Sequence, residues 1–68
     1  MPEQCVALID EIVECRKAQG MTQVDLGRAC GLTQSVIARF ESKKSVPQLD
    51  TLIRILNALG LSLSLTRN

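Results

Sequence analysis

The chain has 68 residues and a mass of 7.4 kDa, which is enough for one small domain with a modest core. It contains no His, Trp or Tyr and one Phe, which excludes imidazole catalysis, His metal ligands and the aromatic platforms that bind single-stranded nucleic acid. The formal net charge is only +1, but all eight Lys and Arg residues follow residue 15, and the segment before them is acidic. Such an asymmetry is consistent with a positive face that binds phosphate.

No feature of the chain predicts an enzyme or a membrane protein. The cysteines Cys5, Cys15 and Cys30 are odd in number and form no C-x-x-C pair, so we expect small buried apolar side chains rather than a zinc site or disulfides. No nucleophile–base pair or metal cluster can be assembled, and we expect no catalytic residue, no cofactor and no metal. The apolar runs are too short to cross a bilayer and the N-terminus lacks a signal peptide, which predicts a cytoplasmic protein.

The first segment, residues 3–19, has the apolar spacing of one helix. Its apolar side chains form two adjacent stripes, with Cys5, Leu8, Ile12 and Cys15 in one and Val6, Ile9 and Val13 in the other. Together the stripes cover about half the circumference, which is wider than one small core needs. We therefore expect the second stripe to contact a second packing partner.

Two short helices are predicted next, at residues 23–30 and 34–42. Thr22 has the position of an N-cap for the first, with Asp25 three residues on as in a capping box, and Thr33 has the position of an N-cap for the second. The link Gly31-Leu32-Thr33 has the length and the glycine of a helix-turn-helix connection. The second short helix is amphipathic, and its polar face is left for contacts outside the core.

A basic loop at residues 42–47 leads to a predicted helix at 48–59. The apolar side chains at helical spacing in this helix are Leu49, Leu52, Ile53, Leu56 and Leu59. The tail then alternates strictly between leucine and a hydroxyl residue, which predicts a strand over residues 61–66. A frayed terminus and a fifth short helix are the alternatives for this tail.

The chain contains no other segment with the pattern of a strand, so the tail's backbone groups would need a second subunit as partner. A two-fold axis makes that pairing antiparallel. The sequence thus predicts an all-α, compact four-helix helix-turn-helix domain over residues 1–68, with a short C-terminal β-strand that pairs across a homodimer. The residues expected at the dimer interface are Leu61, Leu63, Leu65, Val6, Ile9 and Val13.

The segment GMTQVDLGRACGLTQSVIARFE, from Gly20 to Glu41, resembles the helix-turn-helix of the phage-repressor family, also called the Cro or XRE family. The resemblance extends over residues 16–60 and includes the downstream PQLDTLIRILNALG. It implies a DNA-binding transcription regulator. The alternating tail is in turn similar to that of HipB-type antitoxins, which repress their own operon and bind a toxin encoded beside them.

The predicted helix at 34–42 has side chains that suit a DNA major groove. The expected base-reading residues are Gln34, Ser35, Ala38 and Arg39. The Gln34 amide can donate and accept at once, which suits adenine, while Arg39 can bind guanine or a phosphate and Ala38 can contact a thymine methyl. Ser35 can contact either a base or a phosphate. The resemblance implies base readout by the first residues of this helix and by Arg39.

Contacts with the DNA backbone are expected where the helix at 23–30 begins, because its free N–H groups favour anions, and in the basic loop. The expected residues are Thr22, Gln23, Thr33, Lys43 and Lys44. The resemblance implies that Gln23 contacts the backbone and also braces Gln34. The two lysines alone are equally consistent with a solvated loop, and the resemblance favours DNA.

Arg16 lies in the apolar arc of the first helix, where an unpaired charge is costly. The resembling family has an Arg and a Glu at the positions of Arg16 and Glu41, which implies a structural ion pair between them. Three positions depart from the family pattern, and one of them is Val36, which replaces a commonly polar residue. Lys43 stands where Gly is usual, so we expect the helix to end without glycine's left-handed cap, and Gly27 stands where Ala is usual.

The leading hypothesis is therefore a sequence-specific regulator of transcription, a repressor that binds a palindromic double-stranded operator as a homodimer. It includes the option that the chain is the antitoxin of a toxin–antitoxin operon. The alternative hypothesis is a protein-interaction module that neutralises a partner toxin, with DNA binding secondary. The polar outward face of the helix at 34–42 favours the first hypothesis, because an interaction surface more often displays aromatic or Met anchors.

Overall fold

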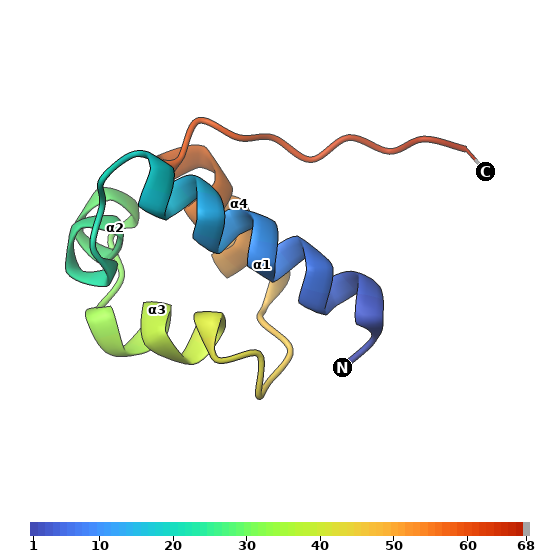
Figure 1. The fold of residues 1–68 in the computed structure, drawn as a ribbon, viewed down its shortest axis with the longest axis horizontal. Helices are drawn as coiled ribbons and strands as arrows, with labels where there is room; N and C mark the ends of the chain where they lie inside the picture. Colours follow the sequence, from blue (N-terminus) through green and yellow to red (C-terminus); the bar gives the residue numbers. More distant parts are fainter. Residues whose placement is uncertain (68) are drawn as a thin grey trace.

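The computed structural model describes residues 1–67 and is all-α over that range. Its helices are α1 (Glu3–Ala18), α2 (Gln23–Cys30), α3 (Gln34–Glu41) and α4 (Leu49–Ala58), and their ends lie within one residue of the expected ranges. The helix α2 packs against both α3 and α4, and α1 packs against α3. In Figure 1, α3 and the C-terminal tail lie on opposite sides of α1. Among residues 1–67, none of the helices combines the length and the apolar character that a bilayer crossing requires.

Hydrogen-bonded caps define the two short helices. The Thr22 hydroxyl accepts from the Asp25 backbone N–H at 3.1 Å, and the Asp25 carboxylate accepts from the Thr22 N–H at 2.9 Å, which completes a capping box. These bonds to Thr22, helped by the charge of Arg28, hold the pKa of Asp25 below its usual range. The Thr33 hydroxyl caps α3 by accepting from the Val36 N–H at 3.2 Å. These side-chain caps fix the residues at which α2 and α3 begin.

The core draws on all four helices and fixes the orientation of α3. Its buried side chains are Ile9, Ile12, Leu26, Ile37, Phe40, Ile55, Leu56 and Leu59. Within α3 the buried residues are Ile37 and Phe40, which leaves the opposite side of this helix free of core contacts. The three cysteines are half-buried, and the Cys30 thiol donates to the Leu26 carbonyl at 3.0 Å.

The burial pattern corrects one expectation about an apolar stripe and shows which apolar residues of α4 are buried. Ile9, expected at a dimer interface with Val6 and Val13, is only 2% exposed and lies in the core, whereas the two valines are half-buried. Of the apolar residues at helical spacing in α4, Leu49 and Ile53 are 70% and 38% exposed, whereas Leu56 lies in the core together with Ile55. Spacing alone defines an apolar arc, and which edge of that arc is buried depends on the neighbouring helices.

The expectation of a strand over residues 61–66 was wrong. Residues 61–67 have no regular secondary structure, because a strand requires a paired neighbour and one chain offers none. The tail is fixed at its start, where the Leu61 N–H donates to the Leu56 carbonyl at 2.8 Å and the Leu61 side chain packs against the core. Leu63 is 45% exposed and Leu65 is fully exposed.

Two of the departures from the family pattern, Gly27 and Lys43, lie at special backbone positions. Gly27 lies against the turn, and a Cβ atom at this position would be 2.8 Å from the Leu32 carbonyl oxygen. A glycine therefore allows the turn to approach α2 closely. Lys43 has a φ of +61°, so α3 does end in a left-handed residue, although we expected that cap to be missing without glycine.

Candidate nucleic-acid interface

The expected base-reading residues share the solvent side of α3. Gln34, Ser35 and Arg39 are exposed, and Ala38 is half-buried. Ser35, Ala38 and Arg39 point away from buried Ile37 and Phe40, because of the helical repeat, and Gln34 lies at the edge nearer α2. The structure thus brings these four side chains together on one surface, which we call the reading surface.

A chain of hydrogen bonds connects this surface with α1. The Arg16 guanidinium donates to both oxygens of the Glu41 carboxylate, from Nε to Oε2 at 2.7 Å and from the terminal nitrogen Nη2 to Oε1 at 2.9 Å. Glu41 Oε1 also accepts from Gln23 Nε2 at 3.0 Å. Gln23 Oε1 in turn accepts from Gln34 Nε2 at 2.7 Å. Four residues from three helices therefore form one continuous network that ends at a base-reading candidate.

The inner end of this network is buried. The side chains of Arg16 and Glu41 are 10% and 9% exposed, and the remaining terminal nitrogen of Arg16 donates to the Met21 carbonyl at 2.7 Å. Within residues 1–67 no buried side-chain nitrogen or oxygen lacks a hydrogen-bond partner. A bidentate, fully satisfied pair at low exposure is held in one geometry, so it ties the end of α3 to the end of α1.

The residues expected to bind the DNA backbone surround the reading surface, but some of them already form hydrogen bonds or salt bridges within the protein. Thr22 and Thr33 are exposed at the N-terminal ends of α2 and α3 and are already engaged as caps. The Lys43 ammonium forms a salt bridge with the Asp10 carboxylate of α1 and its side chain is one-third exposed. Lys44 is exposed, and within the described residues its side chain has no salt bridge. Lys44 is therefore the more available of the two lysines.

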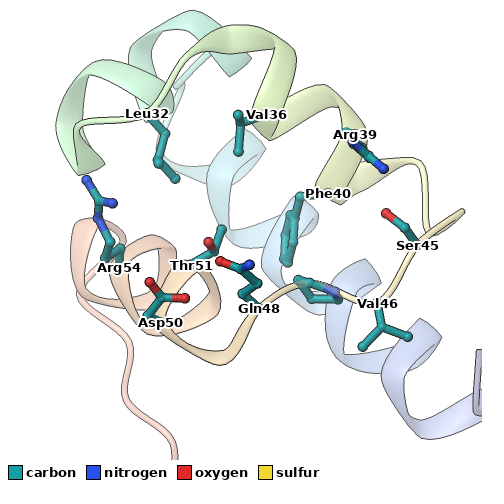
Figure 2. Close-up of a pocket in the computed structure, with 11 residues that line it drawn as sticks. Leu32, Val36, Arg39, Phe40, Ser45, Val46, Gln48, Asp50, Thr51 and Arg54 are labelled. Carbon is teal, nitrogen blue, oxygen red and sulfur yellow. The ribbon is translucent and has the colours of Figure 1, made fainter.

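A groove of about 520 Å³ lies beside the reading surface, between α3 and α4 (Figure 2). Arg39 and Ser45 lie at one end and Arg54 at the other, with Val36 and Phe40 along the α3 side. The Arg54 guanidinium donates to the Gly31 carbonyl at 3.2 Å, so α4 braces the turn between α2 and α3. Sequence reasoning missed this contact, because nothing in the pattern of α4 marks Arg54 as different from a solvated charge.

The chain is similar to known proteins over most of its length. The sequence profile of a helix-turn-helix family matches residues 12–65. An uncharacterized HTH-type transcriptional regulator of Haemophilus influenzae is 42% identical over 60 residues, which cover 88% of this chain and 61% of that protein. The HTH-type transcriptional regulator PuuR of Escherichia coli is 36% identical over 64 residues, covering 94% of this chain and 35% of PuuR.

Two further relatives come from toxin–antitoxin systems. Antitoxin HigA1 of Mycobacterium tuberculosis is 33% identical over 63 residues, covering 93% of this chain and 42% of the antitoxin. A solved toxin–antitoxin module from Streptococcus pneumoniae superposes with a TM-score of 0.79 at 38% identity, covering 96% of this chain and 71% of that one. The chain spans between 35% and 61% of the length of these curated relatives.

Proposed function

Because this chain belongs to the helix-turn-helix family, whose members are DNA-binding regulators and antitoxins rather than enzymes, we propose that it represses transcription by binding a specific double-stranded operator. The observation that carries the proposal is the solvent face of α3, whose polar side chains are free of core contacts while the helix is fixed from behind. Its site of action would be the cytoplasm, where its DNA ligand lies.

In this proposal α3 enters the major groove, which is about 12 Å wide and admits one helix. Gln34 offers an acceptor and a donor to adenine, and Arg39 offers a guanidinium fork to guanine or a phosphate. Ala38 contacts a thymine methyl, and Ser35 a base or a phosphate. Base readout by these four residues gives the sequence preference, and phosphate contacts from the surrounding residues fix the position of the protein on the DNA.

Phosphate contacts come from the ends of the two short helices and from the loop after α3. The N–H groups at the start of α2, together with Thr22 and Gln23, lie next to the reading surface and favour an anion. Thr33 serves the start of α3. Lys44 contributes more than Lys43 to this attraction, because Lys43 is already paired with Asp10.

We further propose that the chain acts as a homodimer on a palindromic operator. One α3 contacts only a few base pairs, and two copies about 34 Å apart contact successive major grooves on one face of the DNA. The exposed side chains of Leu63 and Leu65 supply apolar surface that a second copy would cover, and Leu61 and Leu63 lie beside half-buried Leu8 and Cys15 of α1. Sedimentation equilibrium of the chain truncated after Gly60 tests this, since the truncated chain is expected to be monomeric.

Binding isotherms of two variants test the base readout. Gln34→Ala is expected to cost about 1–3 kcal/mol on an operator selected in vitro and almost nothing on scrambled DNA. The matched control, Lys44→Ala, is expected to weaken binding to both duplexes and to reduce the salt dependence by about one unit. An equal loss on both duplexes for Gln34→Ala would contradict readout by α3.

A second candidate function is toxin neutralisation, and two observations favour it. Both HigA1 and the pneumococcal module are named for toxin–antitoxin systems, and each aligns over more than nine-tenths of this chain. In this reading the partner is a toxin encoded beside the chain. Expression of the adjacent open reading frame alone should arrest growth, and co-expression of this chain should restore it. Arrest that this chain does not relieve would remove the antitoxin function and leave DNA binding untouched.

A further inference from the structure

We propose that the Asp10 carboxylate competes with DNA phosphates for the Lys43 ammonium and so limits how tightly the chain binds any duplex. The inference rests on the proposed function, in which the loop after α3 lies beside the DNA backbone. It adds a role for α1, a helix that the proposed function does not place on DNA. Asp10 is then a residue whose removal strengthens DNA binding.

The salt bridge between Asp10 and Lys43 joins α1 to the loop that follows α3. Lys43 comes two residues after the end of α3, and its Nζ lies 2.5 Å from Oδ1 of Asp10, which is 33 positions earlier in the chain. Helix α1 contributes Ile9 and Ile12 to the core, so it lies on the core side of α3. The salt bridge therefore directs the Lys43 ammonium toward α1 and away from the reading surface.

This salt bridge can be removed without disturbing the fold. The side chains of Lys43 and Asp10 are 33% and 55% exposed, and one ammonium contacts one carboxylate oxygen. An ion pair of this kind contributes little to stability, unlike the buried bidentate pair of Arg16 with Glu41. A substitution at Asp10 is thus expected to change the availability of Lys43 and to leave the position of α3 as it is.

Asp10 and a phosphate are alternative partners for Lys43. The ammonium is a compact point charge, so it cannot bind a phosphate closely while it stays on the carboxylate. Asp10 has the advantage of belonging to the same folded chain, which gives it a high effective concentration at Lys43. If Lys43 left, the released carboxylate would lie close to the phosphates and repel them. Both effects favour the internal salt bridge and reduce the contribution of Lys43 to DNA binding.

The competition acts on every DNA sequence alike. Phosphate contacts carry no sequence information, so a restrained Lys43 lowers the affinity for the operator and for other DNA by one common factor. The preference for the operator then depends on α3. Because a genome contains a large excess of nonspecific sites, a lower general affinity reduces the fraction of the protein held on them.

The experiment measures binding by fluorescence anisotropy at salt concentrations from about 0.05 to 0.2 M. The ligands are a duplex selected from a random-sequence library with the unmodified chain, and a scrambled duplex of the same composition. Asp10→Asn removes the charge and keeps the shape of the side chain. Glu14→Gln is the matched control, because Glu14 is an exposed acid one turn further along α1 and forms no salt bridge within residues 1–67. Circular dichroism checks that each variant is folded.

Asp10→Asn is expected to bind both duplexes about 3- to 10-fold more tightly at about 0.1 M salt, with the ratio of the two affinities unchanged. The slope of log affinity against log salt should steepen by up to about 0.9 unit, since one more phosphate is neutralised. Glu14→Gln should produce a smaller gain and no change of slope. Lys43→Met should abolish the gain of Asp10→Asn, and alone it should cost less affinity than Lys44→Met.

An Asp10→Asn variant that binds no more tightly than Glu14→Gln would overturn the inference. A loss of affinity would also overturn it, because Asp10 would then hold Lys43 in place for a phosphate. A gain that survives Lys43→Met would mean that the charge of Asp10 acts without Lys43, which contradicts the competition. Each of these outcomes leaves DNA binding by α3 intact. The proposed function fails instead if the unmodified chain binds the selected and scrambled duplexes equally.

Discussion

Glu41→Gln removes one charge from the buried pair with Arg16 and keeps the shape of the side chain. Breaking a buried ion pair from one side costs about 3–5 kcal/mol. The lower figure applies here, because the Arg16 guanidinium keeps its bond to the Met21 carbonyl and both side chains retain about a tenth of their exposure. A 68-residue domain has a total stability of about 3–10 kcal/mol, so a loss of about 3 kcal/mol removes a large share of it. At about 4–8 °C per kcal/mol, the melting temperature should fall by about 12–24 °C.

The assay is thermal unfolding followed by far-ultraviolet circular dichroism, since the chain has no Trp or Tyr for fluorescence. Glu14→Gln is the matched control, because Glu14 is an exposed residue of α1, and it should change stability by less than about 0.5 kcal/mol. Arg16→Met combined with Glu41→Leu should recover part of the loss, because no charge is then left unpaired. A Glu41→Gln variant with the same melting temperature as the unmodified chain would refute a buried ion pair between Arg16 and Glu41.

Three further outcomes are expected in urea unfolding. Gly27→Val should lower the free energy of unfolding by about 1–3 kcal/mol, because the valine side chain would collide with the Leu32 carbonyl. An unchanged urea midpoint would mean that the turn can move away from α2 at no cost. Lys43→Gly should raise stability by up to about 1 kcal/mol by relieving a positive φ, even though it removes an exposed salt bridge, and a loss would show that this bridge outweighs the strain. Asp25→Ala should be destabilising at neutral pH, and its effect should shrink as the pH is lowered below the ordinary pKa of an Asp side chain. The pKa of Asp25 is lowered by folding, so its contribution is present above the ordinary Asp pKa and is lost as the pH falls through the folded value, and a difference that persists in acid would contradict this.

The all-α helix-turn-helix fold could be predicted because local signals agreed with one another. The threonines at positions 22 and 33 occur where a helix must begin, and the glycine at position 31 occurs where one must end, so periodicity and caps gave the same boundaries. The burial of Ile9 and the exposure of Leu49 could not be obtained in this way. Each of these residues lies on an apolar arc that is wider than the surface the neighbouring helices cover, so the packing of those helices decides which edge of the arc is buried.

The tail shows a different limit. Alternation in residues 61–66 describes a strand that would have one apolar face, but the pattern contains no information about the partner that the strand needs. The left-handed conformation of Lys43 is similar, because a residue type can disfavour a conformation that the surrounding turn nevertheless imposes.

In the candidate site, Arg16 could be recognised because a charge within an apolar arc must have a partner. This pattern does not predict the other hydrogen bonds that Arg16 and its partner form. The bonds from Gln23 to Glu41 and from Arg54 to Gly31 link residues 18 and 23 positions apart. Such contacts depend on the angles between helices, which sequence spacing does not specify.

The most direct test of the account is an NMR titration of the ¹⁵N-labelled chain with its selected duplex. The backbone amides of Gln34, Ser35 and Arg39 should shift the most, together with the first backbone amides of α2 and the side-chain amides of Gln23 and Gln34. The backbone amides of Glu11 and Glu14, two exposed residues of α1, should shift little. Saturable shifts confined to α1 or the tail, with α3 unchanged, would contradict the claim that α3 reads DNA.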